Sequence, residues 1–416
     1  MLKKIPVSQV RLGMYLHGLE GSWLQHSFWK TRFVVKDPAV LRQLHSCGVA
    51  ECWIDDALGP APESASSGAA AAPATGQPPP ASAPFQPAQT AQPARAEQAA
   101  ELERAAAVCG RARHKVMALF NEARMGRALD VESCLPLVQE VSDSVLRNPD
   151  ALISLARLKT QDDYSFMHSV ATCALMVSLA RQLGMDDDAC RAAGLAGLMH
   201  DIGKALMPLE VLNKPGRLTE AEFAVMRTHP QRGHELLLEG RGTTAQTLDV
   251  VLHHHEKIDG QGYPHRLPGA DIPLLARMGS VCDVYDAITS NRPYKTGWDP
   301  AKSLARMASW KGHFDEAVFA AFVRSLGIYP TGSLVRMASG RLGVVVEQNP
   351  TALVAPVVRL FYSTKSQLRI PPERLDLSCP GCSDRIVGRE SNDEHGFGGL
   401  DDLWLDPELL RRSRAS

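Results

Sequence analysis

Apolar residues recur at helical spacing through most of the middle of the chain. From about residue 97 the stripe comprises Leu102, Ala105, Cys109, Ala112, Val116 and Leu119. This spacing predicts one long amphipathic helix, and two shorter helices are predicted over 135–146 and 151–158. The stripe of the long helix has two interpretations, a dimerisation surface or packing against the following domain, and the sequence favours neither.

Two regions outside this helical stretch alternate at strand spacing. Residues 1–57 contain short apolar runs at 14–16, 32–35 and 49–54, with a helix predicted between Asp37 and Gly48, and they indicate a small mixed α/β domain. Towards the other end, 334–337 and 342–346 alternate about Ser339-Gly340, which predicts a hairpin, and 352–361 supplies further strand.

Composition completes this division of the chain. Residues 58–96 consist largely of Ala, Pro, Ser, Gly and Gln, and they contain too few large apolar side chains to offset the entropy of ordering. We therefore predict an accessory domain (1–57), a disordered linker (58–96), a helical lead-in (97–158), a main helical domain (159–328), a small β appendage (329–378) and a polar, loosely ordered tail (379–416). The predicted fold class is mainly α.

Charge and cysteine content exclude several classes of protein. The chain of 416 residues has a formal net charge of -1, so it lacks the excess of positive charge expected of a protein that binds polymeric nucleic acid. The N-terminus lacks an apolar signal segment and no run approaches the roughly 20 apolar residues of a membrane span, so we expect a cytoplasmic location. The nine cysteines are odd in number and lie mostly in apolar segments, which indicates reduced thiols. Cys379 and Cys382 form one isolated C-x-x-C pair, for which a turn with free thiols is expected rather than a zinc site.

The candidate chemistry begins with the pair His200-Asp201. These two residues lie in the most apolar helical stretch of the chain, on the same predicted helix as Ala193 and Ala196, where burying an imidazole and a carboxylate is costly unless a bound metal compensates. The alanines before the pair allow this helix to approach a neighbouring helix closely. His168 lies on the apolar stripe of the preceding predicted helix, and alone it would be interpreted as a core histidine.

Further imidazoles and carboxylates follow on separate predicted helices. They are His229, His253, His254, His255, Glu256 and Asp283. Such nitrogen and oxygen donors suit Fe, Mn, Co, Ni or Zn better than a thiolate site or an all-oxygen magnesium site would. The candidate ligands are too many for one ion and fit two ions that share a carboxylate. Two such ions hold a water or hydroxide between them and lower its pKa, so the predicted chemistry is phosphoester hydrolysis.

Three basic side chains near these ligands suit an anionic substrate. Lys204, one turn after His200, cannot ligate a metal while protonated but can hold a phosphate. Arg292 and Lys295 directly follow the predicted helix 274–288 that carries Asp283, and they are placed to bind a second phosphate. The alternative for this pair is a favourable positive charge at a helix C-terminus.

Several ordered motifs carry a resemblance to a known family. They are His200-Asp201, His229-Pro230-Gln231-Arg232-Gly233, His254-His255-Glu256, Asp259-Gly260-Gln261-Gly262-Tyr263-Pro264, and Asp283 through Lys295. Together they resemble the HD-GYP domain, a branch of the HD phosphohydrolases, over about 160–325, and residues 1–57 resemble the small domain of unknown function that often precedes it. The resemblance implies an all-helical, metal-dependent bundle that hydrolyses cyclic di-GMP to the linear dinucleotide and, in some members, onward to GMP.

The resemblance also implies roles for individual residues. One metal would be bound by His168, His200, Asp201 and Asp283, and the second by Asp201, His229, His254 and His255. Lys204 would contact the scissile phosphate, Tyr263 would shape the substrate pocket, and Arg292 and Lys295 would bind phosphate. Glu256, Asp259 and Asp286 are expected to fix ligands or the loop that follows them. Tyr164 stands where members with a third metal have a glutamate, so we predict two divalent ions, Fe or Mn before Zn, Co or Ni, and leave open whether GMP is a product.

Three hypotheses of function follow. The first is a cyclic di-GMP phosphodiesterase, and the second is the same chemistry on a related cyclic dinucleotide such as cyclic GMP-AMP, because pocket shape and not the metal site decides between them. The third is a non-catalytic signalling module, which the complete ligand set disfavours. A protein partner of residues 1–57 and a homodimer are also left open.

Overall fold

In the computed structural model the chain forms two compact units, residues 1–90 and residues 91–416. The residues described are 2–19, 33–35, 38, 41–42, 45, 51–55, 91–156, 164–214, 216–290, 297–349 and 351–404. Most of the predicted helix between Asp37 and Gly48 lies outside them, as do residues 58–90 of the predicted linker and 405–416 of the predicted tail.

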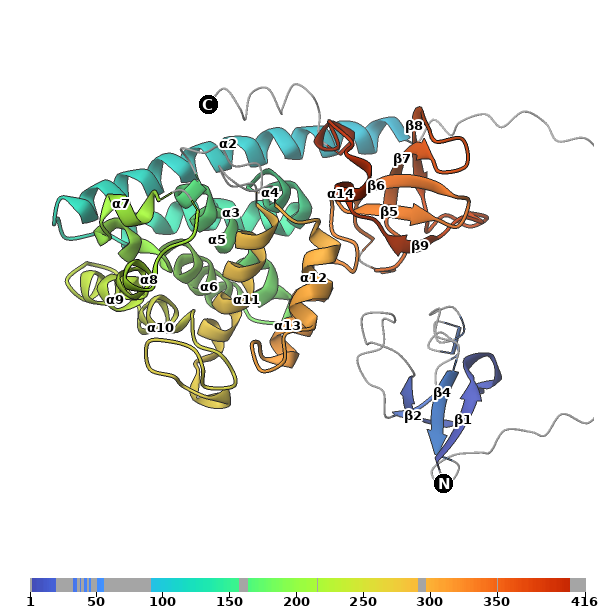
Figure 1. Ribbon diagram of the computed structural model, residues 1–416, viewed down its shortest axis with the longest axis horizontal. Helices are drawn as coiled ribbons and strands as arrows, with labels where there is room; N and C mark the ends of the chain where they lie inside the picture. Colours follow the sequence, from blue (N-terminus) through green and yellow to red (C-terminus); the bar gives the residue numbers. More distant parts are fainter. Residues whose placement is uncertain are drawn as a thin grey trace, which may run out of the picture. The chain divides into compact units, whose positions relative to one another are not determined.

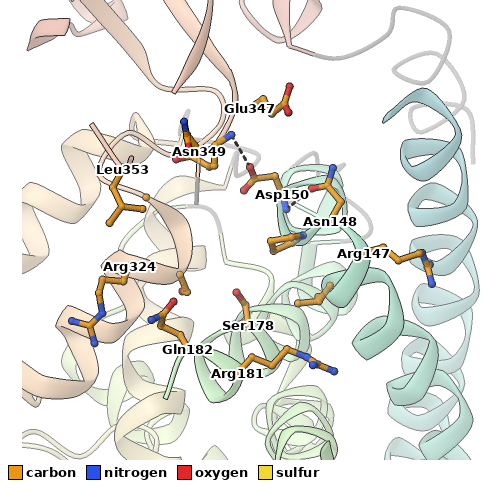
Figure 2. A pocket seen from close by; sticks show the side chains of 15 residues that line it. Arg147, Asn148, Asp150, Ser178, Arg181, Gln182, Arg324, Glu347, Asn349 and Leu353 are labelled. Atoms are coloured by element: carbon orange, nitrogen blue, oxygen red, sulfur yellow. Dashed lines mark hydrogen bonds between the residues drawn. The ribbon is translucent and has the colours of Figure 1, made fainter. Parts of the chain in front are cut away.

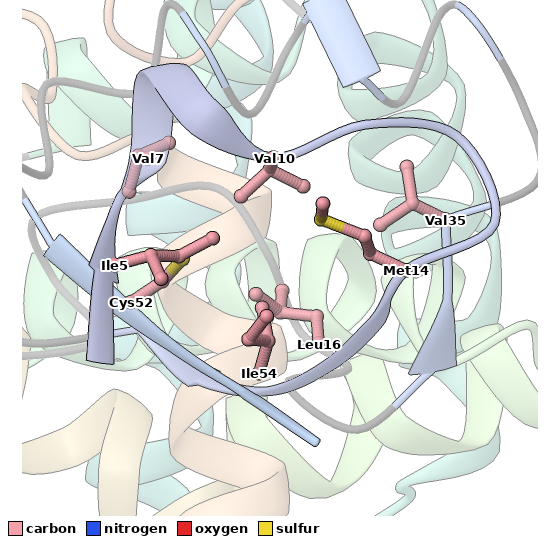
Figure 3. Close-up of a cluster of buried hydrophobic side chains, with 8 residues drawn as sticks. All are labelled: Ile5, Val7, Val10, Met14, Leu16, Val35, Cys52 and Ile54. Atoms are coloured by element: carbon pink, nitrogen blue, oxygen red, sulfur yellow. The ribbon is translucent and has the colours of Figure 1, made fainter. Parts of the chain in front are cut away.

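The first unit contains a small antiparallel sheet. Its strands are β1 (Leu2–Pro6), β2 (Tyr15–Leu19), β3 (Phe33–Val34) and β4 (Glu51–Asp55), in the spatial order β1-β4-β2-β3. The pattern predicted the last three strands approximately and missed β1. One face of the sheet buries Ile5, Val7, Val10, Met14, Leu16, Val35, Cys52 and Ile54 (Figure 3). Period-two alternation accounts for this core, since Cys52 and Ile54 are buried while Trp53 between them is exposed.

The second unit is mainly helical, and its first element is the longest. Helix α2 (Ala91–Arg124) starts six residues before the predicted position and packs along α3 (Leu135–Arg147), α4 (Pro149–Ala156) and α5 (Tyr164–Gln182) (Figure 1). Ala105, Ala112 and Val116 are buried in this contact. The apolar stripe of α2 therefore packs within the chain, which is the second of the two interpretations.

The remaining helices build the part of the bundle that carries the predicted ligands. They are α6 (Asp187–Met199), α7 (Leu209–Leu212), α8 (Glu220–Met226), α9 (His229–Leu238), α10 (Ala245–His253), α11 (Leu274–Thr289), α12 (Pro300–Ala308) and α13 (Glu316–Leu326). Helix α5 contacts α6 and α11, and α10 contacts α6, α9 and α11, so these five helices pack around one centre. The close contact of α6 with α5 depends on Gly197, where a Cβ atom would lie 2.9 Å from the carbonyl oxygen of Thr172.

The chain then forms a second antiparallel sheet. Its strands are β5 (Leu334–Met337), β6 (Arg341–Glu347), β7 (Val357–Ser363), β8 (Leu368–Asp376) and β9 (Ile386–Arg389), in the order β8-β7-β6-β5-β9, followed by the short helix α14 (Asn392–His395). The predicted hairpin is confirmed as β5 and β6. The expectation of a loosely ordered tail after 378 is wrong for 386–389, because β9 pairs with β5 and gains its backbone partners from a strand about 50 residues earlier.

Three further predictions concern the fold class, membrane spans and one pair of cysteines. The fold is mainly α with small sheets, as predicted. Among the described residues, none of the helices has the length and apolar character needed to cross a membrane. Cys379 and Cys382 are free thiols joined by a turn in which the Cys382 N–H donates to the Cys379 carbonyl at 3.0 Å, as expected.

Candidate metal centre

The helix packing brings ligands from five segments to one place. His168 lies on α5 and Asp283 on α11, while His229 is the first residue of α9 and His254 follows the end of α10. The sequence placed His200-Asp201 on a continuing helix, and this detail is wrong. Helix α6 ends at Met199, His200 caps it, and Asp201 starts a turn into the short 3-10 helix η4 (Ile202–Leu206).

All seven predicted ligands fall into two groups that share one residue. Their donor atoms lie within 4.8 Å of one another in each group. The first group is His168, His200, Asp201 and Asp283, and the second is Asp201, His229, His254 and His255. Six of the seven side chains are buried, and His255 is half-buried.

Asp201 directs one oxygen to each group. Its Oδ2 atom lies 3.3 Å from His200 Nε2 and 3.5 Å from His168 Nε2. Its Oδ1 atom lies 3.1 Å from His229 Nε2 and 3.7 Å from His254 Nε2, and Oδ1 is buried without a hydrogen-bond donor in favourable geometry. This is the arrangement of a carboxylate that can bridge two cations.

The histidine hydrogen bonds fit a metal centre. The Nδ1 atoms of His200, His229 and His254 lie 2.8 to 3.1 Å from backbone carbonyl oxygens, which can only accept, so Nδ1 carries the proton. In a neutral imidazole this leaves a lone pair on Nε2. The Nε2 atoms of His229 and His254 are 3.3 Å apart, as are those of His168 and His200. The facing lone pairs of His229 and His254 cannot hydrogen-bond at this distance, whereas a cation between them would satisfy both.

The electrostatics of the centre favour neutral imidazoles at His254 and His255 and an ionised carboxylate at Asp201. Burial, with the nearby His200, lowers the pKa of His254 to about 3, and burial also holds the pKa of His255 well below its usual range. Burial alone would raise the pKa of Asp201, but Lys204 and His200 outweigh it and hold that pKa well below the usual range. These are the protonation states in which the side chains bind metals.

Of the three carboxylates expected to fix ligands or the loop, Asp286 contacts a candidate ligand and the other two contact the loop. Asp286 accepts a hydrogen bond from His168 Nδ1 at 2.5 Å. Glu256 accepts from the backbone N–H groups of residues 265, 266 and 267 at 2.6 to 3.1 Å, and Asp259 accepts from that of Gln261 at 2.9 Å. The loop after His255 is thereby fixed next to the centre.

The predicted substrate contacts are partly described. The ammonium of Lys204 forms an ion pair with Asp201 Oδ2, and the ring of Tyr263 stacks on that of His255 at 4.7 Å between centroids. Arg292, Lys295 and the side chain of Tyr164 lie outside the described residues. His253, the extra histidine, belongs to neither ligand group and lies 3.0 Å from His265 through their ring nitrogens.

Sequence reasoning missed Arg227, which lies two residues before the ligand His229. Its guanidinium carbon is 4.6 Å from the centroid of the Tyr263 ring and 5.9 Å from that of Phe223. The only signal in the sequence was a basic residue next to a ligand motif, and this signal carries no information on the contact with a ring 36 residues away.

A separate cavity of about 540 Å³ lies between α4, α5, α13 and the loop after β6 (Figure 2). Asp150 lies at its edge and accepts a hydrogen bond from the backbone N–H of Gln348 at 3.3 Å. None of the predicted ligands lines this cavity, so it is not part of the metal centre.

Two parts of the chain match known protein families. Residues 141–318 match the HD domain family, and residues 2–134 match a domain of unknown function, DUF3391. The fold and the two ligand groups thus define a metal-dependent phosphohydrolase of the HD type.

Longer matches identify the branch. The chain is 52% identical over 406 residues to a cyclic di-GMP phosphodiesterase of Pseudomonas aeruginosa, covering 97% of this chain and 96% of that protein. It is 38% identical over 210 residues to the cyclic di-GMP phosphodiesterase response regulator RpfG of Xanthomonas campestris, covering 49% and 54% of the two chains. It is 33% identical over 177 residues to the 3'3'-cGAMP-specific phosphodiesterase 1 of Vibrio cholerae, covering 42% and 41%. The chain belongs to the HD-GYP family of cyclic di-GMP phosphodiesterases.

Proposed function

We propose that this protein hydrolyses cyclic di-GMP to the linear dinucleotide with two divalent first-row ions, Fe or Mn in preference to Zn, Co or Ni. The observation that carries the proposal is Asp201, whose two oxygens face separate histidine groups in a buried pocket. The near full-length similarity to a cyclic di-GMP phosphodiesterase supports the choice of substrate.

Two sets of residues would hold the two ions. His168, His200 and Asp283 would hold one ion, and His229, His254 and His255 the other, with Asp201 shared. Bound divalent ions supply Lewis acidity and make water a nucleophile at neutral pH. The protein buries most of the ligands away from bulk water and orients four of the five imidazoles, all but that of His255, through a backbone or carboxylate acceptor.

Two side chains would act on the substrate. Lys204 is about a quarter exposed, with its ammonium next to Asp201, where it would meet the scissile phosphate and balance its negative charge. Burial raises the pKa of Tyr263, so its phenol stays protonated at neutral pH and can donate a hydrogen bond to the substrate. Arg292 and Lys295 stay predictions as phosphate contacts.

The product is proposed to be the linear dinucleotide. A glutamate for a third ion is absent from the sequence, which has Tyr164 at that position. The second cleavage, from linear dinucleotide to GMP, is therefore expected to be slow, and product analysis over time would test this.

The test is a hydrolysis assay on protein purified anaerobically without chelator and supplied with Fe(II) or Mn. We expect linearisation of cyclic di-GMP at a metal content near two per chain. His254→Gln should abolish it, whereas the matched control His253→Gln, at the neighbouring buried histidine outside both ligand groups, should retain it. An enzyme with both sites filled that hydrolyses no cyclic dinucleotide would support the non-catalytic hypothesis instead.

A second substrate is favoured by three of the relatives. The similarity to a 3'3'-cGAMP-specific phosphodiesterase makes cyclic GMP-AMP the alternative, and direct competition between the two cyclic dinucleotides would decide. Action on an intracellular messenger would place the protein in the cytoplasm. A protein partner of residues 1–57 and a homodimer remain predictions, and retained hydrolysis after deletion of residues 1–57 would separate partner binding from catalysis.

A further inference from the structure

Four planar side chains form a row from the candidate metal centre to the surface. The Tyr263 ring stacks on His255 at 4.7 Å with an angle of 29° between the planes, the guanidinium of Arg227 lies 4.6 Å from the Tyr263 centroid, and Phe223 follows at 5.9 Å from Arg227. His255 is half-buried and Phe223 is 48% exposed. The row therefore begins at a candidate metal ligand and ends in solvent.

Within this row, the guanidinium N–H groups of Arg227 are available as hydrogen-bond donors. In the part of the chain that the structure describes, the guanidinium lies over the two rings and has neither a carboxylate partner nor a hydrogen-bond acceptor. Arg277 on α11 shows the usual outcome, since it donates to Asp315 at 2.7 Å. A guanidinium has five N–H donors in a planar fork, so Arg227 presents a rigid donor edge beside the centre.

Helix α8 holds Arg227 and Phe223 in place. The side chain of Thr219 accepts from the backbone N–H of Glu222, whose carboxylate accepts from the Thr219 N–H at 2.7 Å, and this forms a capping box. Lys214 donates to the same carboxylate at 2.6 Å. Phe223 and Arg227 are four residues apart and so lie on one face of the helical segment.

We infer that Phe223 and Arg227 form a base-recognition site that reads guanine in the substrate, an inference that rests on the proposed hydrolysis of a cyclic dinucleotide. An exposed aromatic ring offers a stacking surface for a base, and the arginine fork matches the O6 and N7 acceptors of guanine. Adenine presents an N6 donor in place of O6 and would lose one of the two bonds. A phosphate would explain the guanidinium but not the exposed ring beside it.

The experiment compares kcat/KM for cyclic di-GMP and for cyclic di-AMP, which has no guanine, in wild type and in Arg227→Lys, which keeps the charge and loses the fork. We expect wild type to prefer the substrate with two guanines and Arg227→Lys to reduce that preference roughly 10- to 100-fold, mainly through KM. Phe223→Leu should weaken both substrates alike. Arg232→Lys, at an exposed arginine of α9, is the matched control and should keep the wild-type ratio.

Each outcome decides between explanations. Metal content and melting temperature near those of wild type show that Arg227→Lys has kept the centre intact, and equilibrium binding of both nucleotides to chelator-treated protein reports the preference without turnover. A wild-type ratio of one, or an unchanged ratio in Arg227→Lys, would overturn the guanine assignment, and equal loss on both substrates would indicate a phosphate contact. Absence of hydrolysis by metal-loaded wild type would refute the proposed function itself.

Discussion

Replacement of Asp201 by asparagine tests whether one carboxylate serves both metal sites. The variant keeps the shape of the side chain and removes its negative charge. Because Oδ2 faces His200 and Oδ1 faces His229, both sites should lose affinity together. The comparison variant His229→Gln removes a ligand from one group only and should empty mainly that site.

The expected magnitude follows from linkage. An ion present at about 100 times its dissociation constant stabilises the folded state by about 2.7 kcal/mol per site. A domain of this size gains roughly 2 to 4 °C in melting temperature per kcal/mol, so wild type should gain about 10 to 20 °C with two ions. His229→Gln should keep about half of that gain, and Asp201→Asn should keep almost none.

The assay combines elemental analysis with thermal unfolding in the presence and absence of metal. Melting of the chelator-treated variants provides the folding control, since a variant that is folded without metal can be compared directly. If Asp201→Asn retained one ion and half of the thermal gain, as His229→Gln is expected to, the bridging role of Asp201 would be wrong.

Three further predictions follow from other contacts. Asp286→Asn should weaken metal binding about 10- to 100-fold in a metal titration, because the histidine that donates to Asp286 loses its charged acceptor. Gly203→Ala should lower the free energy of unfolding by about 1 to 3 kcal/mol in denaturant titration, because the added Cβ would lie 1.9 Å from the carbonyl oxygen of the first residue of α9. The control Gly110→Ala, where α2 has open space for a Cβ, should be neutral or stabilising. Chelator-treated protein should lose stability as the pH falls below about 6.5, because His254, whose pKa is lowered to about 3 in the folded state, then binds a proton only in the unfolded state. The free energy of unfolding should fall by about 1.4 kcal/mol per pH unit for this residue between about pH 5.5 and 4. Stability that rises on acidification over this range would contradict the last prediction.

Local pattern predicted helices such as α2, α3, α4 and α11 because the periodicity of each is contained within a few turns of chain. The spacing of apolar residues placed α11 within one residue at its C-terminus, and the β5–β6 hairpin followed from alternation about a glycine turn. Strands whose partners are distant were predicted poorly. Strand β9 was expected to be loosely ordered, since the hydrogen bonds that order it come from β5.

The chemistry of the candidate site divides in the same way. The sequence by itself determined the donor types and, through the ordered motifs, the family to which they belong. Only the tertiary structure decided that Asp201 turns one oxygen to each group, that Asp286 supports His168 across 118 residues of chain, and that Arg227 lies over the Tyr263 ring. The physical reason is that these contacts are made between helices, and the packing of one helix on another depends on small residues such as Gly197 and on the exact end of α6 at Met199, neither of which can be read from the periodicity of a single segment.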